Sequence, residues 1–292
     1  MRSIVAGLTP APVLVSKRNR SFREMYMEAL RRNHVVISGQ GRRPLVFAHG
    51  YGCDQQMWRF VAPAFEASHR VVLFDHVGCG RSDITAYDEK RHGSLHGYAE
   101  DLVEILQAAD LHDAVLVGHS VSAMICVLAA QAAPDRVSAV ALVCPSPRYL
   151  NDPPDYVGGF ERADIDGLLD MIDHNMVGWT SFLAPVVAGP QDDAGVTDEL
   201  KAAFCALDPY VARRFAEVTF LSDNRADLAG LRQPALVLQV AEDAIAPRAV
   251  GEYVQRQLPA GRLVTLDTAG HCPHMTHPAV TIAALRDFLA AV

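Results

Sequence analysis

Hydrophobic residues along the chain gather in short continuous runs that are rich in valine, leucine and alanine. Continuous runs, as opposed to alternating ones, are typical of strands buried on both faces of a parallel sheet. Between them lie segments of helical length with amphipathic spacing, such as 95–109 and 121–132. This βαβα order predicts an α/β fold with a mostly parallel, doubly wound sheet. The predicted strands are His34–Ser38, Leu45–Ala48, Val71–Phe74, Ala114–Val117, Val137–Val143, Ala235–Val240 and Arg262–Leu266.

The alternation of strands and helices stops after Cys144 and resumes at Pro234. The chain between them begins with proline and glycine turns and continues with helical segments rich in Leu, Met, Phe and Trp. We interpret residues 145–210, approximately, as a helical lid inserted into one domain that spans 34–292. Open α/β sheets bind ligands outside the carboxyl ends of their strands, so we expect the lid to cover that edge.

Residues 1–33 differ in charge from the rest of the chain. They contain seven Lys or Arg against two Glu, whereas the whole protein has a formal charge of −8. We interpret them as an N-terminal extension that is flexible, with Met27 as an alternative translation start; Pro10 and Pro12 disfavour the amphipathic helix of a targeting peptide. The acidic remainder repels phosphate backbones, so no nucleic acid partner is expected.

The six cysteines are scattered and form no CxxC pair. Free thiols are typical of a reducing compartment, which favours a cytoplasmic location. No apolar run reaches the roughly 20 residues that a membrane-spanning helix requires, so we expect no membrane association.

The strongest chemical signal is the segment 115–124, Val-Leu-Val-Gly-His-Ser-Val-Ser-Ala-Met. An apolar strand runs into a helix through a turn of small residues, with Ser120 at its apex, which is the pattern of a nucleophile elbow. The usual pattern is GxSxG, and Ser122 replaces the last glycine. An N-cap role for Ser120 is the alternative, but it does not explain the whole strand, turn and helix context.

A serine hydroxyl requires a base to take its proton and a third group to orient that base. On α/β folds with a nucleophile elbow, an acidic residue and then a histidine follow the nucleophile along the chain. Asp243 follows the strand Ala235–Val240, and His271 follows the next strand. The pattern therefore indicates a Ser120, Asp243, His271 triad. Position alone does not choose between Asp243 and its rivals Glu242 and Asp267.

Backbone amides usually stabilise the oxyanion on this fold. The amide of Val121 is one candidate, and Tyr51, in the loop after Leu45–Ala48, is the other. Only one base is needed, so we interpret His49 in the same loop as a bracing side chain.

Two other readings of the chemistry are weaker. His274 and His277 follow His271 at a spacing that resembles a metal site, but a metal-bound His271 could not act as a base. We therefore predict no metal and no cofactor, with His274 and His277 as surface or helix-capping residues. The loop 75–83 contains GxG but lacks the third glycine of a dinucleotide site.

From about residue 34 onward the chain resembles the α/β-hydrolases of the RsbQ type and their plant relatives, the karrikin and strigolactone receptors. The resemblance is carried by Gly-His-Ser-Val-Ser-Ala-Met at 118–124, Ser-Pro-Arg-Tyr-Leu-Asn-Asp at 146–152 and Gly-His-Cys-Pro-His-Met at 270–275. It implies an α/β-hydrolase fold with a helical lid, the same triad, and oxyanion amides at Tyr51 and Val121. Family members commonly have phenylalanine where Tyr51 stands, so its hydroxyl is expected to make the pocket entrance more polar.

The resemblance also implies pocket walls at Trp179, Leu183 and Phe220. It implies slow hydrolysis of a small hydrophobic ester, lactone or butenolide-like ligand, coupled to signalling through a PAS-containing phosphatase or another sensor protein. The alternative reading is a metabolic carboxylesterase or carbon–carbon bond hydrolase with no signalling role. A binding protein with a vestigial triad is a third reading, which an intact Ser120, Asp243 and His271 opposes.

Overall fold

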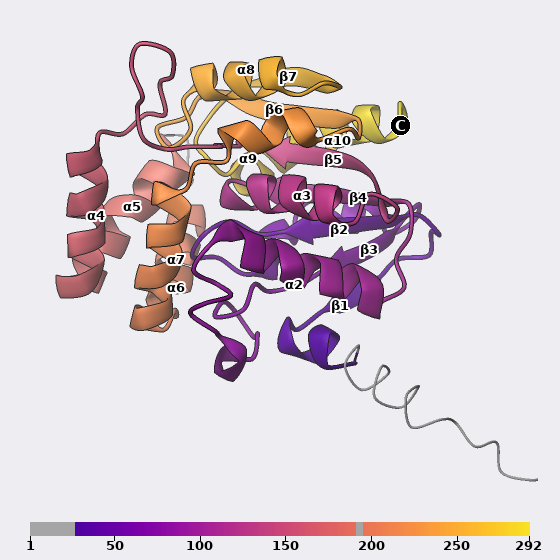
Figure 1. The fold of residues 1–292 in the computed structure, drawn as a ribbon, viewed down its shortest axis with the longest axis horizontal. Coiled ribbons are helices and arrows are strands. Elements are labelled where there is room, and N and C mark those ends of the chain that lie inside the picture. The colour runs from indigo at the N-terminus through magenta and orange to yellow at the C-terminus, as the bar shows by residue number, and fades with distance from the viewer. Residues whose placement is uncertain (1–26, 191–194) are drawn as a thin grey trace, which may run out of the picture.

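The computed structural model describes residues 27–190 and 195–292, and its centre is a seven-stranded sheet in the order β1-β3-β2-β4-β5-β6-β7 (Figure 1). Strand β1 runs antiparallel to β3, and all other neighbours are parallel. The predicted α/β fold with a mostly parallel sheet is confirmed. The strands are β1 (Val36–Ser38), β2 (Pro44–Ala48), β3 (Arg70–Leu73), β4 (Ala114–His119), β5 (Val137–Val143), β6 (Ala235–Glu242) and β7 (Gly261–Ala269).

The central strands β2 and β4 are buried at every residue, which is why their sequences are continuous apolar runs. Helices cover the sheet, and α3 packs against both α2 and the strands β4 and β5. Because α3 lies between these neighbours, it is apolar around nearly its whole circumference. The helices outside the lid are α2 (Leu95–Ala108), α3 (Val121–Ala132), α8 (Arg248–Gln257), α9 (Pro273–Thr276) and α10 (Pro278–Leu289).

The described part of the segment between β5 and β6 forms four α-helices that gather at one end of the molecule, on the left in Figure 1. The fourth, α7, starts where the sequence suggested that the lid ends. Its first turn is set by Asp208, whose side chain accepts hydrogen bonds from the amides of Tyr210 and Val211, and by Pro209 at the first helical position. The lid helices are α4 (Arg162–His174), α5 (Met176–Ala188), α6 (Gly195–Cys205) and α7 (Pro209–Leu221).

The two ends of the lid are held together by ion pairs. Asp223, just after α7, contacts Arg148 at 2.6 Å and Arg225 at 2.7 Å. Hydrogen bonding to Arg225 and Arg148 outweighs the effect of burial and lowers the pKa of Asp223 to about 2. The carboxylate therefore stays charged, and the entry and exit of the lid stay joined, over the whole neutral and mildly acidic range.

The end of the expected N-terminal extension packs on the domain. Residues 27–32 are helical, Arg32 forms an ion pair of 2.9 Å with the buried Asp101, and the Asn33 side chain donates to the carbonyl of Asp75 at 3.0 Å. Residues 1–26, to which the predicted flexibility mainly refers, lie outside the described residues.

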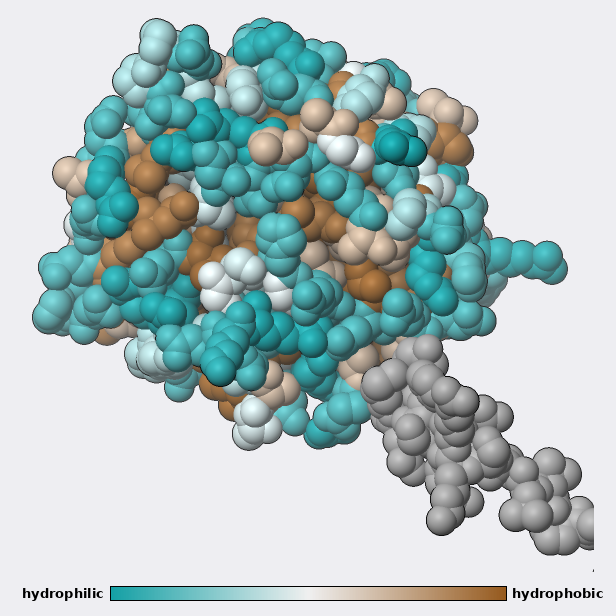
Figure 2. Space-filling model, viewed as in Figure 1, coloured by the Kyte–Doolittle hydropathy of each residue, from teal (hydrophilic) through white to brown (hydrophobic). Residues whose placement is uncertain are grey.

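The surface seen in Figure 2 is mainly hydrophilic, with hydrophobic residues in small separate patches. Among the described residues, no helix combines the length and the apolar character needed to cross a bilayer. All six cysteines are free thiols, and only Cys205 is exposed.

Candidate active site

The elbow between β4 and α3 places Ser120 in a conformation that side chains rarely adopt, with φ 57° and ψ −124°. The turn is possible because its neighbours are small. A Cβ atom on Gly118 would lie 2.3 Å from the carbonyl oxygen of Ser122, so the strand and the helix can approach only with glycine there. The turn lifts the Ser120 side chain out of the strand at the carboxyl edge of the sheet.

Three side chains that are far apart in the sequence meet at this edge. The hydroxyl of Ser120 lies 2.8 Å from Nε2 of His271, and Nδ1 of His271 lies 2.8 Å from Oδ2 of Asp243. All three residues are buried. The rivals Glu242 and Asp267 are exposed, so the geometry distinguishes between the carboxylates where the sequence could not.

The surroundings of Asp243 favour the ionised form of its carboxyl group. Its Oδ1 accepts the amides of Ile245 at 2.8 Å and Ala246 at 3.0 Å, which leaves Oδ2 for the histidine. Burial opposes the charge, but attraction to His271 and these hydrogen bonds outweigh it and lower the pKa of Asp243 below its ordinary value. An ionised carboxylate at Oδ2 holds the proton of His271 at Nδ1, so that Nε2 can accept a proton from Ser120.

The two amides expected at the oxyanion hole come from two different elements. Tyr51 follows β2, and Val121 is the first residue of α3. Within the part of the chain that is described, neither amide N–H has a hydrogen-bond acceptor. Both are therefore available to an oxygen that gains negative charge.

Ser120 and His271 line a cavity of about 30 Å³ whose other walls are mainly apolar side chains. Leu183 and Phe220 line this cavity, as the sequence suggested. Trp179 does not: it is fully buried behind the wall, with its ring 6.0 Å from Tyr51 and 5.2 Å from Phe204. The other walls include Tyr51, Cys53, Tyr149, Val187, Phe204, Thr219 and Ile245.

Tyr149 was not predicted as a site residue. Its hydroxyl lies 3.1 Å from that of Ser120, and burial raises the pKa of Tyr149, so it remains a neutral hydrogen-bonding group. Thr219 is the other missed polar residue: its hydroxyl is buried and has no partner among the described residues. Tyr149 lies in the segment 146–152 that carries the family resemblance, and no other signal in the sequence points to it.

The lid is hydrogen-bonded to two loops of the site. The hydroxyl of Tyr51 donates to the carbonyl of Ala212 in α7 at 2.8 Å, and the amide of His271 donates to the carbonyl of Val187 in α5 at 2.8 Å. Val187 lies in the last turn of α5, where carbonyls have no partner within the helix. The expectation that the Tyr51 hydroxyl makes the pocket entrance polar is wrong, because this hydroxyl is used in the buried hydrogen bond to the carbonyl of Ala212.

Replacing Tyr51 by phenylalanine tests this contact. We expect Y51F to lose about 1 kcal/mol of stability, the usual contribution of a buried neutral hydrogen bond. Amide hydrogen exchange in α7 should become severalfold faster, while ester hydrolysis stays within about threefold, because the backbone amide remains. Unchanged exchange in α7 would show that the hydroxyl does not restrain the lid.

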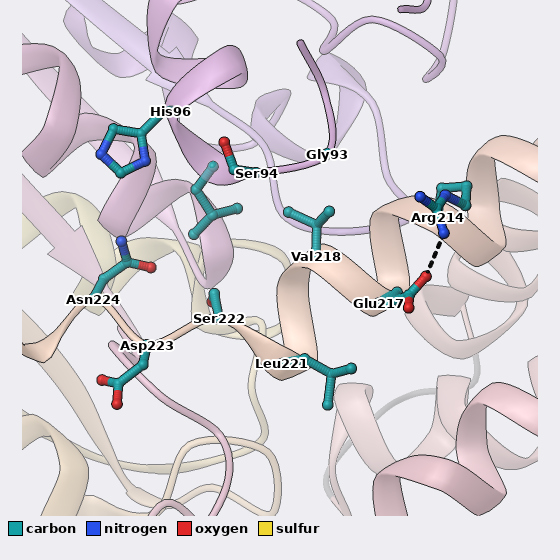
Figure 3. A pocket seen from close by; sticks show the side chains of 11 residues that line it. Gly93, Ser94, His96, Arg214, Glu217, Val218, Leu221, Ser222, Asp223 and Asn224 are labelled. Carbon is teal, nitrogen blue, oxygen red and sulfur yellow. Dashed lines mark hydrogen bonds and ion pairs between the residues drawn. The ribbon is translucent and has the colours of Figure 1, made fainter. Parts of the chain in front are cut away.

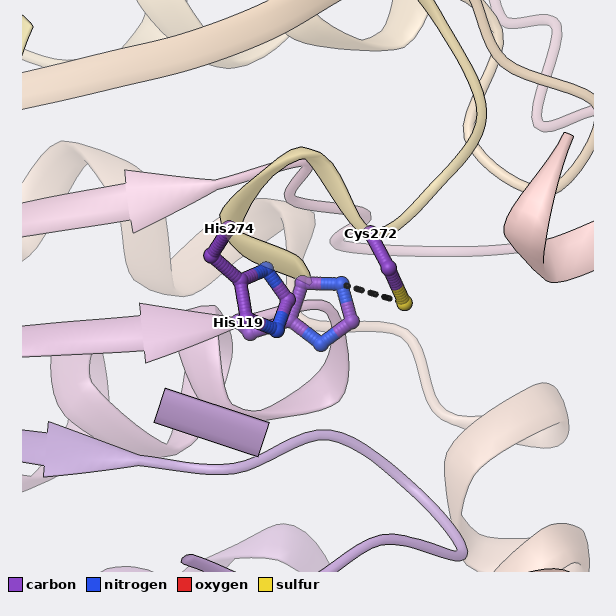
Figure 4. Close-up of side chains that lie close together, drawn as sticks. All are labelled: His119, Cys272 and His274. Atoms are coloured by element: carbon purple, nitrogen blue, oxygen red, sulfur yellow. Dashed lines mark hydrogen bonds between the residues drawn. The ribbon is translucent and has the colours of Figure 1, made fainter. Parts of the chain in front are cut away.

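Next to His271 lies a buried cluster of His119, Cys272 and His274, which Figure 4 shows from close by. His274 is fully buried and stacks near Trp58, at 4.4 Å between ring centroids, so its prediction as a surface or helix-capping residue is wrong. It faces inward because α9 is a single turn that packs onto the helical turn at Gln55–Trp58.

These three side chains form one of two groups among the described residues whose donor atoms all lie within 4.8 Å of one another, as in a metal site; the other group is Cys144, Asp243 and His271. Two features favour packing instead. Nε2 of His119 already bonds the carbonyl of His271 at 2.8 Å, and burial raises the pKa of the Cys272 thiol well above its usual range. Burial and the neighbouring His271 also lower the pKa of His119 to about 3, so the cluster stays neutral beside the triad.

A larger hollow, of about 420 Å³, lies between the start of α2 and the end of α7 (Figure 3). Its walls include His96, Arg214 and Asn224, and they share no residue with the cavity at Ser120. This larger hollow therefore lies apart from the candidate triad.

Comparison with known proteins agrees with this architecture. Residues 43–278 match the family model of the alpha/beta hydrolase fold. The chain is 37% identical to a karrikin insensitive 2 receptor of Petunia hybrida, with 87% of this chain and 94% of the receptor covered. It is 36% identical to a strigolactone esterase of Arabidopsis thaliana, with 89% and 96% covered.

Among solved structures, a hydrolase from Oleispira antarctica is similar, with a TM-score of 0.90 and 42% identity, covering 91% of this chain and 98% of that one. Residues 43–278 hold six of the seven strands, the elbow and the lid, and more than two thirds of each relative is covered. The chain is therefore a member of the alpha/beta hydrolase family, on the side of that family that contains esterases and plant receptors.

Proposed function

We propose that this protein hydrolyses a small hydrophobic ester or lactone with Ser120 as nucleophile, His271 as general base and Asp243 as the orienting acid. The observation that carries the proposal is the buried series of hydrogen bonds from Ser120 through His271 to Asp243, opening on an apolar cavity. A neutral serine next to a correctly oriented imidazole is the arrangement that acyl transfer requires.

In the proposed reaction, Oγ of Ser120 attacks the carbonyl carbon while Nε2 of His271 takes its proton. The carbonyl oxygen gains negative charge and is stabilised by the amides of Tyr51 and Val121. His271 then gives its proton to the departing alkoxide, and an acyl-enzyme remains. Water, deprotonated by His271, releases the acid and regenerates Ser120.

The cavity argues for a small substrate. The cavity of about 30 Å³ between mainly apolar walls is small, so we expect the lid or the side chains to move before a bulky ligand can bind. A butenolide-like ring is compatible with such a site. The names of the plant relatives, a strigolactone esterase and a karrikin receptor, support the same class of ligand.

Shortening a wall residue tests substrate size. We expect the parent protein to prefer acetate over hexanoate esters of p-nitrophenol, and L183A to raise the hexanoate-to-acetate ratio of kcat/KM at least about tenfold, because one or two methylenes in a tight pocket discriminate by that much. L200A is the matched control: Leu200 is buried in the lid but does not line the cavity. Equal rates for both esters in the parent protein would contradict the size argument.

The proposal extends to signalling. Similarity to receptors that share this architecture supports slow turnover reported to a protein partner, with the RsbQ type and its PAS-containing phosphatase as the bacterial version, in the cytoplasm. Pre-steady-state kinetics with a lactone distinguishes this from a metabolic esterase. A burst followed by slow release supports the signalling role, whereas fast turnover of one metabolite supports the metabolic one.

A further inference from the structure

Behind the candidate oxyanion loop lies a fully buried polar group of three residues from three elements: His49 after β2, His76 after β3 and Ser122 in α3. None of them touches the Ser120 hydroxyl in a hydrogen bond. The reaction as written above uses none of them, yet polar side chains are seldom placed inside a core without a purpose.

The hydrogen bonds of the group have one consistent direction. Nδ1 of His49 lies 2.9 Å from the carbonyl of Gly50, which can only accept, so His49 carries its proton at Nδ1. Its Nε2 is then free to accept the amide of His76, at 2.9 Å. Burial lowers the pKa of both imidazoles, which agrees with neutral rings.

Ser122 completes the group. Its hydroxyl donates to the carbonyl of His49 in a short hydrogen bond. Having donated its proton, the same oxygen accepts from Nε2 of His76 at 2.7 Å. Every bond therefore has an assigned donor, and two successive carbonyls of the oxyanion loop, those of His49 and Gly50, are held from behind.

When the carbonyls of His49 and Gly50 are held, the orientations of the N–H groups in the same two peptides are held as well. In a trans peptide the C=O and the N–H point in opposite directions, so a Gly50 carbonyl held toward the His49 ring turns the N–H of Tyr51 away from it. The preceding peptide is held in the same way, because the amide of Gly50 contacts Sδ of Met57 at 3.4 Å. Tyr51 and Ser120 line the same cavity, and the Tyr51 N–H has no acceptor among the described residues, so we expect this N–H to meet the substrate oxygen.

We propose that Ser122 and His76 are positioning residues that aim the Tyr51 amide at the developing oxyanion. This inference rests on the proposed function and adds a role for the serine that departs from GxSxG. A glycine at 122 would satisfy the packing requirement of the elbow but would leave the His49 carbonyl and the His76 ring without their partner. The hydroxyl thus joins the nucleophile helix to the oxyanion loop, so that both move as one unit.

The test compares two substrates that differ in one atom: an aryl ester and the thionoester in which sulfur replaces the carbonyl oxygen. Ser120 attacks both in the same way, and the leaving aryl oxide is the same. Sulfur is larger and accepts hydrogen bonds weakly, so a well-aimed oxyanion hole favours the oxygen ester. The ratio of the two kcat values therefore measures how well the amides are aimed.

We expect S122A and H76F each to lower kcat for the oxygen ester about 10- to 100-fold, somewhat less than the loss of a whole oxyanion donor. The thionoester rate should change less than about threefold, so the ratio falls, while KM and the acidic limb of the pH profile stay as in the parent. H76Q, whose amide nitrogen can occupy the place of Nε2, should restore most of the ratio.

The double variant H76F/S122A separates positioning from stability. The double variant leaves one unpaired group, the His49 carbonyl, whereas S122A leaves both that carbonyl and the His76 N–H, so thermal stability should partly recover relative to S122A while the ratio stays low. T281V is the control for loss of a buried hydroxyl elsewhere. It removes the Thr281 hydroxyl of α10, which donates to the carbonyl of His277 at 3.1 Å, and should leave the ratio unchanged.

A ratio that stays at the parent value in S122A, H76F and the double variant would overturn the positioning role. A parent protein without Ser120-dependent hydrolysis of the oxygen ester would instead overturn the proposed function. The two failures are therefore distinguishable in one set of assays.

Discussion

Replacing Ser120 by alanine is expected to lower kcat for a p-nitrophenyl ester by at least about 10⁴-fold. Loss of a triad nucleophile removes the covalent route and leaves only the contribution of the oxyanion hole and binding. The fold should persist, since alanine is no larger than serine and can occupy the same strained turn. The parent protein exposed to a small lactone should gain the mass of an acyl adduct, and S120A should not.

Two comparisons make this result interpretable. Thermal unfolding of S120A should match the parent within a few degrees and its circular dichroism should be unchanged, because among the described residues the lost hydroxyl forms hydrogen bonds only with His271 and Tyr149. Hydrolysis at the parent rate in S120A, or an adduct at another residue, would rule out Ser120 as the nucleophile.

Replacing Asp243 by asparagine is expected to lower kcat about 10⁴-fold while the fold is retained. The Asn oxygen can still accept the amides of Ile245 and Ala246, which turns its NH₂ group toward Nδ1 of His271. The imidazole must then carry its proton at Nε2, where it faces Ser120 as a donor and cannot act as a base. D267N is the matched control, because that carboxylate is exposed on β7, and it should keep full activity.

The same variant has a pH signature in stability. The pKa of Asp243 in the folded protein lies below its ordinary value of 3.8, so its ionisation stabilises the fold above about pH 4 and this contribution is lost as the pH falls through the lower folded pKa. The free energy of unfolding of the parent, measured relative to D243N by urea titration, should therefore decrease below pH 4. A difference that is independent of pH would contradict the lowered pKa.

The sheet was predictable because its strands are buried on both faces, which produces the continuous runs at Leu45–Ala48 and Val137–Val143. The strand β7 extends beyond its predicted bounds, because most of its residues are partly exposed and its pattern is mixed. The end of the lid was harder to predict, because α7 has the composition of any amphipathic helix. Its assignment to the lid depends on its packing against α4, a tertiary contact that leaves no local signal.

In the candidate site, too, some residues could be predicted from the sequence and others depend on tertiary contacts. Ser120 and His271 follow from local sequence and chain order, whereas the choice of Asp243 over Glu242 depends on which side chain points inward at the end of β6. Tyr149 and Thr219 reach the cavity only through the folding of the lid over the sheet. The local sequence around these residues does not indicate such contacts, because the contacting residues are far apart in the chain. Ser120 and Tyr149, for example, are separated by 29 positions.

The hydrogen bond between the amide of His271 and the carbonyl of Val187 couples the last turn of α5 to the backbone of the proposed base. If that turn slides by even an ångström or two, the backbone of the base loses an acceptor and its loop is free to reorient. A partner protein bound to α5 would therefore respond to the position of the His271 imidazole. By reciprocity, binding of that partner could shift the imidazole away from Ser120.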